Sequence, residues 1–139
     1  MRAAILTLSD KGARGERVDA SGPALSAWLA ERGVTTVAAE VIADEYQQII
    51  AKLTAWADSD TADLILTTGG TGVSPRDVTP EATMQVVTRL IPGMAELMRL
   101  RSMEKTRMAA LSRAVVGIRA QSLIINLPGS CLLYTSRRG

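Results

Sequence analysis

Short apolar runs alternate along the chain with segments in which apolar residues recur every three or four positions. The runs predict buried strands at Ala3–Leu8, Val34–Ile42, Leu64–Leu66 and Ser122–Leu127, and a further apolar segment occupies Ala114–Ile118. The periodic segments predict helices that begin near Pro23, at Asp44–Glu45 and at Thr79, with another helical piece around Met94–Met98. Strands alternating with helices at this spacing indicate an α/β fold with a mainly parallel sheet and helices on both faces.

Local signals predict where some of these elements begin and end. Thr79 is expected to cap its helix, followed by Pro80 in the first turn, and this helix should run to a break at Pro92–Gly93. Met84 is expected to face inward from it. The polar stretch at residues 11–21 is predicted to be a surface loop.

The stretch from Asp63 to Ala82 carries the clearest motif. A strand stops at Thr67–Thr68 and gives way to Gly69, Gly70, Thr71 and Gly72, where missing Cβ atoms let a ligand approach the backbone amides. Strand, glycine turn and helix in this order predict an anion-binding loop. The loop fits neither the dinucleotide-binding fingerprint nor a Walker loop, so a turn that needs glycine only for steric reasons is the alternative.

Composition narrows the classes of function. The 139 residues suffice for one domain, and the net charge of +2 comes from two arginines near the carboxyl end. Basic residues are not interleaved with aromatics, which argues against nucleic-acid binding. No apolar stretch is long enough to span a membrane and the start resembles no signal peptide, so we expect a cytoplasmic protein.

Histidine is absent and Cys131 is the only cysteine. The chain therefore cannot use a histidine base, a disulfide within itself, or a metal cluster of thiolates or imidazoles. Any catalysis must therefore use carboxylates, hydroxyls, backbone amides and a bound cation.

The ends of the predicted strands supply a candidate site. In an open parallel sheet, ligands bind beyond the carboxyl ends of the strands. Four polar or glycine-rich segments are expected to meet there: Ser9–Asp10, Ala43–Asp44, the glycine loop, and Pro128, Gly129 and Ser130.

Asp44 and Asp77 are the two acids of interest at this edge. Asp44 could instead be a helix cap paired with Gln47, and Asp77 an exposed acid beside Arg76. Carboxylates next to a phosphate-binding loop make sense with a divalent cation between them, and Mg²⁺ suits one or two carboxylates plus substrate phosphates. Phosphoryl or nucleotidyl transfer needs positioning and charge neutralisation but no protein nucleophile.

The segments LSDKGARGERVDASGPAL, TTGGTGVSPRDVTPEAT, LSRAVVGIR and LIINLPGS together resemble the molybdopterin adenylyltransferase family of molybdenum-cofactor biosynthesis, which is related to the amino-terminal domain of gephyrin. The resemblance implies a three-layer α/β/α sandwich of the molybdopterin-binding type, usually a homotrimer. It implies transfer of AMP from Mg-ATP to the terminal phosphate of molybdopterin with release of pyrophosphate, and a molybdate-insertase partner that uses the product.

The resemblance also assigns residues. The family's two catalytic aspartates fall on Asp44 and Asp77, which would hold Mg²⁺. Ser9, Asp10 and Ser112 match motif positions near the pterin. The nucleotide and pterin-phosphate loops fall on Gly69, Gly70, Thr71, Gly72, Pro128, Gly129 and Ser130.

After Ser130 the chain departs from the family, whose members continue with a Pro-Lys pair and a helix. We interpret residues 1–130 as the molybdopterin-binding α/β domain and residues 131–139 as a tail produced by truncation or a mis-joined reading frame. Two alternatives to the enzyme stay open: a non-catalytic molybdopterin-binding relative, and a flavodoxin-like module that binds a phosphorylated cofactor such as FMN.

Overall fold

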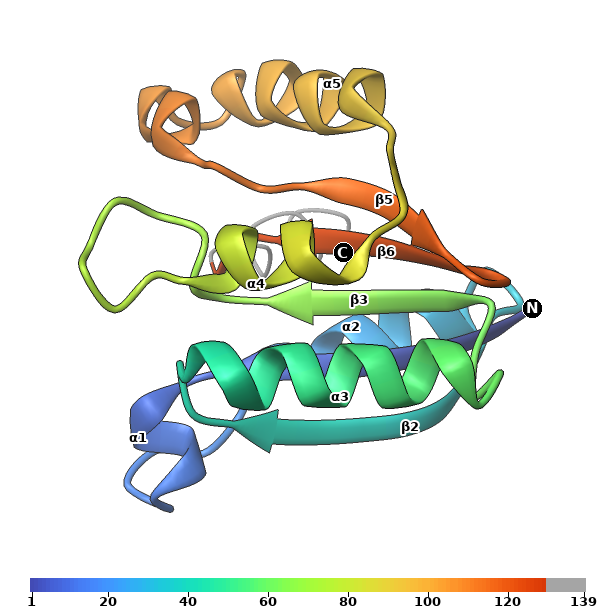
Figure 1. Ribbon diagram of the computed structural model, residues 1–139. Coiled ribbons are helices and arrows are strands. Elements are labelled where there is room, and N and C mark those ends of the chain that lie inside the picture. The colour runs from blue at the N-terminus through green and yellow to red at the C-terminus, as the bar shows by residue number, and fades with distance from the viewer. Residues whose placement is uncertain (130–139) are drawn as a thin grey trace.

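The computed structural model describes residues 1–129, which form a six-stranded sheet with helices on both sides (Figure 1). Four neighbouring strands are parallel, and two more extend the sheet beyond β6, the first antiparallel to β6 and the second antiparallel to the first. The mainly parallel α/β fold is confirmed, and the antiparallel edge was not predicted. Across the sheet the order is β2 (Thr35–Ile42), β1 (Arg2–Leu8), β3 (Leu64–Thr68), β6 (Ser122–Leu127), β5 (Val116–Arg119) and β4 (Arg89–Leu90).

The helices make the outer layers of the predicted α/β/α sandwich. α2 (Ser21–Ala30) packs on one face of the sheet, and α3 (Tyr46–Asp58) with α4 (Thr79–Val86) packs on the other. Figure 1 shows α3 and α4 in front of the sheet, α2 behind it, and α5 (Pro92–Met103) above β5. Two short elements, α1 (Asp10–Ala13) and the 3₁₀ helix η1 (Arg107–Leu111), complete the fold.

Strand β1 explains why the sequence shows an unbroken apolar run there. Side chains alternate between the faces of a strand, and both faces of β1 are covered. Ala3 and Ile5 pack with Leu25 and Leu29 of α2, whereas Leu6 and its neighbours Ala4 and Leu8 belong to the core beneath α3 and α4. The predicted apolar face of α3 is confirmed, since Ile49, Leu53, Trp56 and Ala57 are buried.

Several local predictions were wrong. Thr79 does not cap α4, since Val78 stands at the N-cap position and the Thr79 hydroxyl donates to the carbonyl of Gly69. α4 ends at Val86 because the backbone turns extended at Val87 and leads into β4. Within α4 the buried face carries Ala82, Thr83 and Val86, and Met84 is 48% exposed instead of inward. Pro92 begins α5 instead of breaking a helix, as its fixed φ and missing N–H suit a first helical turn. The predicted loop at residues 11–21 contains most of α1, whose first turn is capped by Ser9.

Buried Asn126 connects the elements that flank the glycine loop. Its Nδ2 donates to the hydroxyls of Thr67 on β3 and Thr83 on α4, both at 3.0 Å. Its Oδ1 accepts from the amide of Val115 at 3.0 Å. These bonds fix the strand before the loop against the helix after it, which holds the loop's two ends at a set separation.

Within the described part of the chain, no helix has the length and apolar character needed to cross a membrane.

Candidate active site

The carboxyl ends of the parallel strands lie together at the edge of the sheet where α1 and the loop between β3 and α4 are found (Figure 1). A cavity of about 490 Å³ opens there, which we call the polar cavity. It brings together residues that were predicted from four separate segments. Its lining includes Ser9, Asp10, Asp44, Gly69, Gly70, Asp77 and Gly129.

A second cavity of about 400 Å³ lies on the other side of the glycine loop, and we call it the apolar cavity. Met98 of α5 with Met108 and Leu111 of η1 form much of its wall, and the predicted residues Thr71, Gly72, Ser112 and Pro128 also line it. The two cavities adjoin because Gly69, Gly70, Asp77 and Gly129 line both.

The four carbonyls of the glycine loop all accept hydrogen bonds from Thr79 or Arg113. Thr79 donates from its hydroxyl to the carbonyl of Gly69 (3.1 Å) and from its amide to that of Gly70 (3.2 Å). Arg113 donates from its amide to the carbonyl of Thr71 and from Nε to that of Gly72, both at 2.8 Å. The amides of residues 70–73 have no hydrogen-bond acceptor within residues 1–129. Because N–H and C=O point in opposite directions across a peptide, these amides face away from the bonded carbonyls, as in the backbone nests that suit an anion.

Glycine is required in the loop for both conformation and space. Gly69 and Gly70 have φ of +99° and +71°, in the left-handed region. A Cβ on Gly70 would lie 2.3 Å from Thr79 Oγ1 and 2.9 Å from Asp44 Oδ1, and one on Gly72 would lie 2.9 Å from Asp77 Oδ2. The loop backbone therefore passes directly against both aspartates, which a turn built for steric reasons alone does not require.

Asp44 and Asp10 are joined by two reciprocal hydrogen bonds. The Asp10 amide donates to Asp44 Oδ2 (3.3 Å), and the Asp44 amide donates to Asp10 Oδ1 (3.0 Å). Helix α3 begins beyond Asp44 without a side-chain cap, so the capping-box alternative is wrong. Asp44 Oδ1 is buried without a hydrogen-bond partner in the described structure.

The surroundings of Asp44 disfavour its charged form. Burial raises the pKa of Asp44, and the negative charges of Asp10 and Asp77 raise it further. A carboxylate oxygen that is buried, unpartnered and flanked by other acids is electrostatically unsatisfied. A cation at this point would relieve that condition.

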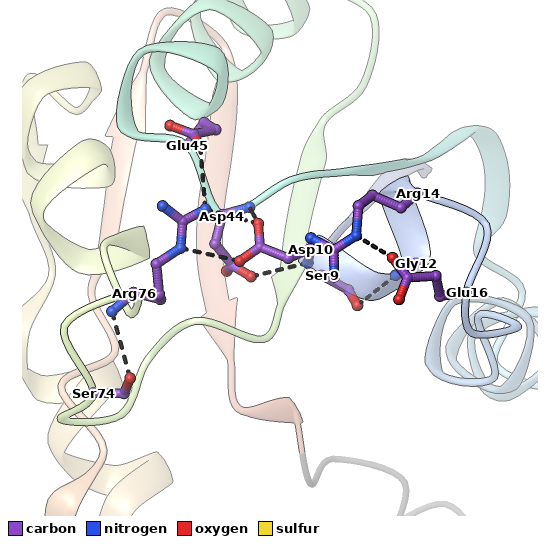
Figure 2. A network of polar contacts seen from close by, with 9 residues as sticks. All are labelled: Ser9, Asp10, Gly12, Arg14, Glu16, Asp44, Glu45, Ser74 and Arg76. Carbon is purple, nitrogen blue, oxygen red and sulfur yellow. Dashed lines mark hydrogen bonds and ion pairs between the residues drawn. The ribbon is translucent and has the colours of Figure 1, made fainter.

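Arg76 connects the loop to the strand ends (Figure 2). Its guanidinium binds Asp10 through two bonds, Nε to Oδ2 at 3.0 Å and Nη2 to Oδ1 at 2.8 Å, and reaches Glu45 Oε1 at 3.1 Å. The hydrogen bond from Arg76, followed by that from the Asp44 amide, lowers the pKa of Asp10. Asp10 is thereby held as a carboxylate that is already neutralised by an arginine.

Asp77 follows directly in the chain and is oriented locally. Its Oδ2 accepts from the amide of Ser74 at 2.9 Å, and its own amide donates to the carbonyl of Ser74. The side chain lines both cavities. The predicted pair of Asp44 and Asp77 thus faces one common space, the polar cavity.

The remaining predicted residues have varied surroundings. The Ser9 hydroxyl caps α1 by accepting from the Gly12 amide at 3.0 Å (Figure 2). Ser112 lines the apolar cavity at the end of η1. Pro128 offers its carbonyl to the Thr68 hydroxyl at 3.5 Å. Ser130 and the tail at residues 131–139 lie outside the described residues.

Arg113 is the residue at this site that the sequence analysis missed. It lies between η1 and β5 and reaches the loop and Asp77 from about forty positions away along the chain. Arg113 belongs to the LSRAVVGIR segment, but the sequence does not show what it binds, because its contacts exist only after the sheet has formed.

Among the described residues, no three His, Cys, Asp or Glu side chains gather into a group able to hold a metal on their own. The residues present still fit a Mg²⁺ ion shared with a substrate, since this ion needs only one or two carboxylates beside phosphate oxygens. Asp44 Oδ1, buried and unpartnered, is the atom that supports this fit.

Fold and site together define an α/β protein in which a glycine-loop backbone and two aspartates, Asp44 and Asp77, meet at the carboxyl edge of the sheet. Residues 4–134 match the family model described as "Probable molybdopterin binding domain". The chain belongs to this family, as its sequence motifs predicted.

Similarity to individual relatives supports this family membership. The chain is 43% identical over 127 residues to molybdopterin adenylyltransferase of Helicobacter pylori, covering 90% of this chain and 72% of that protein. It is 42% identical to the Drosophila melanogaster molybdenum cofactor synthesis protein cinnamon, of which it spans 21%. The crystal structure of the molybdopterin biosynthesis enzyme MoaB from Thermus thermophilus superposes with a TM-score of 0.86 at 53% identity, covering 93% of this chain and 81% of that one.

Proposed function

We propose that this protein is a molybdopterin adenylyltransferase of molybdenum-cofactor biosynthesis. It transfers AMP from ATP to the terminal phosphate of molybdopterin and releases pyrophosphate. The observation that carries the proposal is that the loop amides and Asp44 Oδ1, which have no hydrogen-bond partner among residues 1–129, lie at one edge, beside Asp77. A site with free donors for an anion and a free carboxylate for a cation suits a metal-bound polyphosphate. The adenylyltransferase name of the Helicobacter pylori relative supports this reaction.

In the proposed reaction, an oxygen of the molybdopterin phosphate forms a bond to the α-phosphorus of ATP while the bond from that phosphorus to the β-bridging oxygen breaks. Pyrophosphate leaves with the electron pair. The amides of the nest stabilise negative charge on the phosphate oxygens, and no protein nucleophile takes part. Asp44 and Asp77 would hold Mg²⁺, which neutralises phosphate charge when bound.

The two cavities give one compartment for each substrate. Their shared residues Gly69, Gly70, Asp77 and Gly129 lie where the reacting phosphates of both substrates would have to meet. Adjoining compartments hold two reactants close together, which lowers the entropic part of the barrier.

The test is release of pyrophosphate from Mg-ATP and molybdopterin by the wild type and by Asp77→Asn. We expect the wild type to release pyrophosphate only when both substrates are present, and Asp77→Asn to lose at least about a hundredfold in rate, because one metal-holding carboxylate is gone. Asp58→Asn is the matched control, since Asp58 pairs with Arg119 and lines neither cavity. Tight molybdopterin binding without any turnover would favour the non-catalytic alternative instead.

Self-association as a homotrimer, the use of the product by a molybdate-insertase partner and a cytoplasmic location remain predictions from the family resemblance. One feature supports self-association: α5 and η1 expose a set of large apolar side chains. These are Leu97, Leu100, Met103, Met108 and Leu111, each between 44% and 66% exposed. Light scattering coupled to size-exclusion chromatography measures the oligomer directly, and a monomeric mass would refute the trimer.

A further inference from the structure

We infer that Arg113 is a positioning residue for both parts of the site: it fixes the direction of the loop amides and holds Asp77 in place. Four hydrogen bonds support this. The Arg113 amide reaches the carbonyl of Thr71, Nε that of Gly72 and Nη2 that of Asp77, all at 2.8 Å, and Nη1 reaches Glu81. The inference rests on the proposed function in taking the loop as a phosphate-binding site.

The reasoning follows from peptide geometry. In a trans peptide, the carbonyl of one residue points opposite to the amide N–H of the next. Binding the carbonyls of Thr71 and Gly72 on the Arg113 side therefore aims the amides of Gly72 and Val73 the other way, away from Arg113. Thr79 does the same for the amides of Gly70 and Thr71. Arg113 thus orients half of the nest.

The same guanidinium controls Asp77. Its Nη2 bond to the Asp77 carbonyl anchors the main chain at that residue, while the Ser74 amide orients the carboxylate. A planar guanidinium presents its donors in a fixed fork, so one side chain sets the distance between Gly72 and Asp77. A lysine ammonium in its place would keep the charge but not the planar fork that fixes this distance.

A purely structural role is the competing explanation, and the chain offers a matched control for it. Arg119 also pairs with an acid and a main-chain carbonyl, binding Asp58 through Nε and Nη2 and the Val86 carbonyl through Nη1, but it contacts neither the glycine loop nor Asp77. The side chains of Arg113 and Arg119 are 37% and 27% exposed. Half-exposed ion pairs of this kind contribute little to stability, so both substitutions should leave the protein folded.

The experiment measures the Kd of magnesium pyrophosphate, by calorimetry, for the wild type, Arg113→Ala, Arg113→Lys and Arg119→Ala, each with its melting temperature. We expect Arg113→Ala to weaken binding at least about tenfold, the loss that follows when an amide bond to a charged group is misdirected. Arg119→Ala should bind like the wild type. Added methylguanidine should restore part of the binding to Arg113→Ala, and Arg113→Lys should fall between that variant and the wild type.

Wild-type binding by Arg113→Ala, or an equal loss in Arg119→Ala, would overturn the inference. If Arg113→Ala does not fold, Arg113→Lys carries the same comparison. Pyrophosphate binding does not depend on turnover, so the two proposals fail separately. A wild type that binds pyrophosphate but never adenylylates molybdopterin contradicts the proposed function alone, whereas an active Arg113→Ala with intact binding contradicts the positioning role alone.

Discussion

Replacing Gly70 by alanine tests whether the loop is shaped for its ligand. Gly70 has φ of +71°, and Gly33 has φ of +77°. An L residue in this region costs about 1–2 kcal/mol, so both Gly70→Ala and Gly33→Ala carry that penalty. A Cβ on Gly33 meets nothing within 4 Å, which makes Gly33→Ala a control for conformation alone.

The added cost at Gly70 comes from contacts. The new Cβ would lie 2.3 Å from Thr79 Oγ1 and 2.9 Å from Asp44 Oδ1, so these side chains must move. Overpacking of this kind costs about 1–3 kcal/mol, and losing the Thr79 bond to the Gly69 carbonyl costs about 1 kcal/mol more. We therefore expect Gly70→Ala to be about 2–4 kcal/mol less stable than Gly33→Ala.

Urea unfolding and pyrophosphate release measure the two consequences. With a urea dependence of about 2 kcal/mol/M, the midpoint of Gly70→Ala should lie about 1–2 M below that of Gly33→Ala. Gly70→Ala should lose nearly all pyrophosphate release under conditions where it is still folded, because both the nest and Asp44 are displaced. Gly33→Ala should retain the wild-type rate. Normal turnover by Gly70→Ala, or an equal loss in both variants, would refute this account of the site.

Two further predictions concern buried polar groups. Asp44→Asn should raise the melting temperature at pH 7 by a few degrees, since it replaces a carboxylate whose pKa is raised by burial and neighbouring acids, yet it should abolish pyrophosphate release. The pH dependence of stability tests this prediction. Because the folded state raises the pKa of Asp44, it favours the protonated carboxyl, so the stability that Asp44 contributes is present in acid and is lost as pH rises. The difference in urea midpoint between Asp44→Asn and the wild type should therefore grow from pH 4 to pH 7. A constant difference across that range would contradict the reasoning. Asn126→Ala should lower the free energy of unfolding by about 3–5 kcal/mol, because it leaves two buried hydroxyls and the Val115 amide without their partner, and a loss below 1 kcal/mol by urea unfolding would contradict this.

The sequence predicts the parallel part of the fold mainly because β1, β3 and β6 lie inside the sheet and read as apolar runs, whereas the edge strand β2 has no fully buried residue. The sequence does not predict β4, whose two residues Arg89–Leu90 are both exposed and leave no apolar signal. The sequence also does not predict the end of α4. Apolar residues beyond Val86 keep the spacing of a helix, although the backbone is extended from Val87. Thr79 looks like a cap by position, but its hydroxyl binds the Gly69 carbonyl instead. Tertiary contacts decide each of these points.

For the candidate site too, the sequence predicts some of the residues and not others. Glycines and acids at strand ends are visible in the sequence because ligands of open parallel sheets bind at that edge. Their partners are not visible: Arg113 reaches the loop only through the folded sheet, and Arg76 reaches Asp10 across 66 positions. Residue roles inferred from the motifs, including Mg²⁺ binding by Asp44 and Asp77, stay predictions until they are measured.

The hydrogen bonds made and not made by the glycine loop and Asp44 indicate what kind of ligand the site suits. A folded chain rarely leaves buried polar groups without partners, because each costs free energy. Here the four loop carbonyls from Gly69 to Gly72 are all bonded, whereas the amides of residues 70–73 and Asp44 Oδ1 have no partner among residues 1–129. The amides suit an anion and the carboxylate oxygen suits a cation, and both lie at the same edge of the sheet. An anion alone would leave Asp44 Oδ1 without a partner and a cation alone would leave the loop amides without an acceptor from the described chain, so we propose a phosphate ester that carries its own metal ion as the ligand that would serve both.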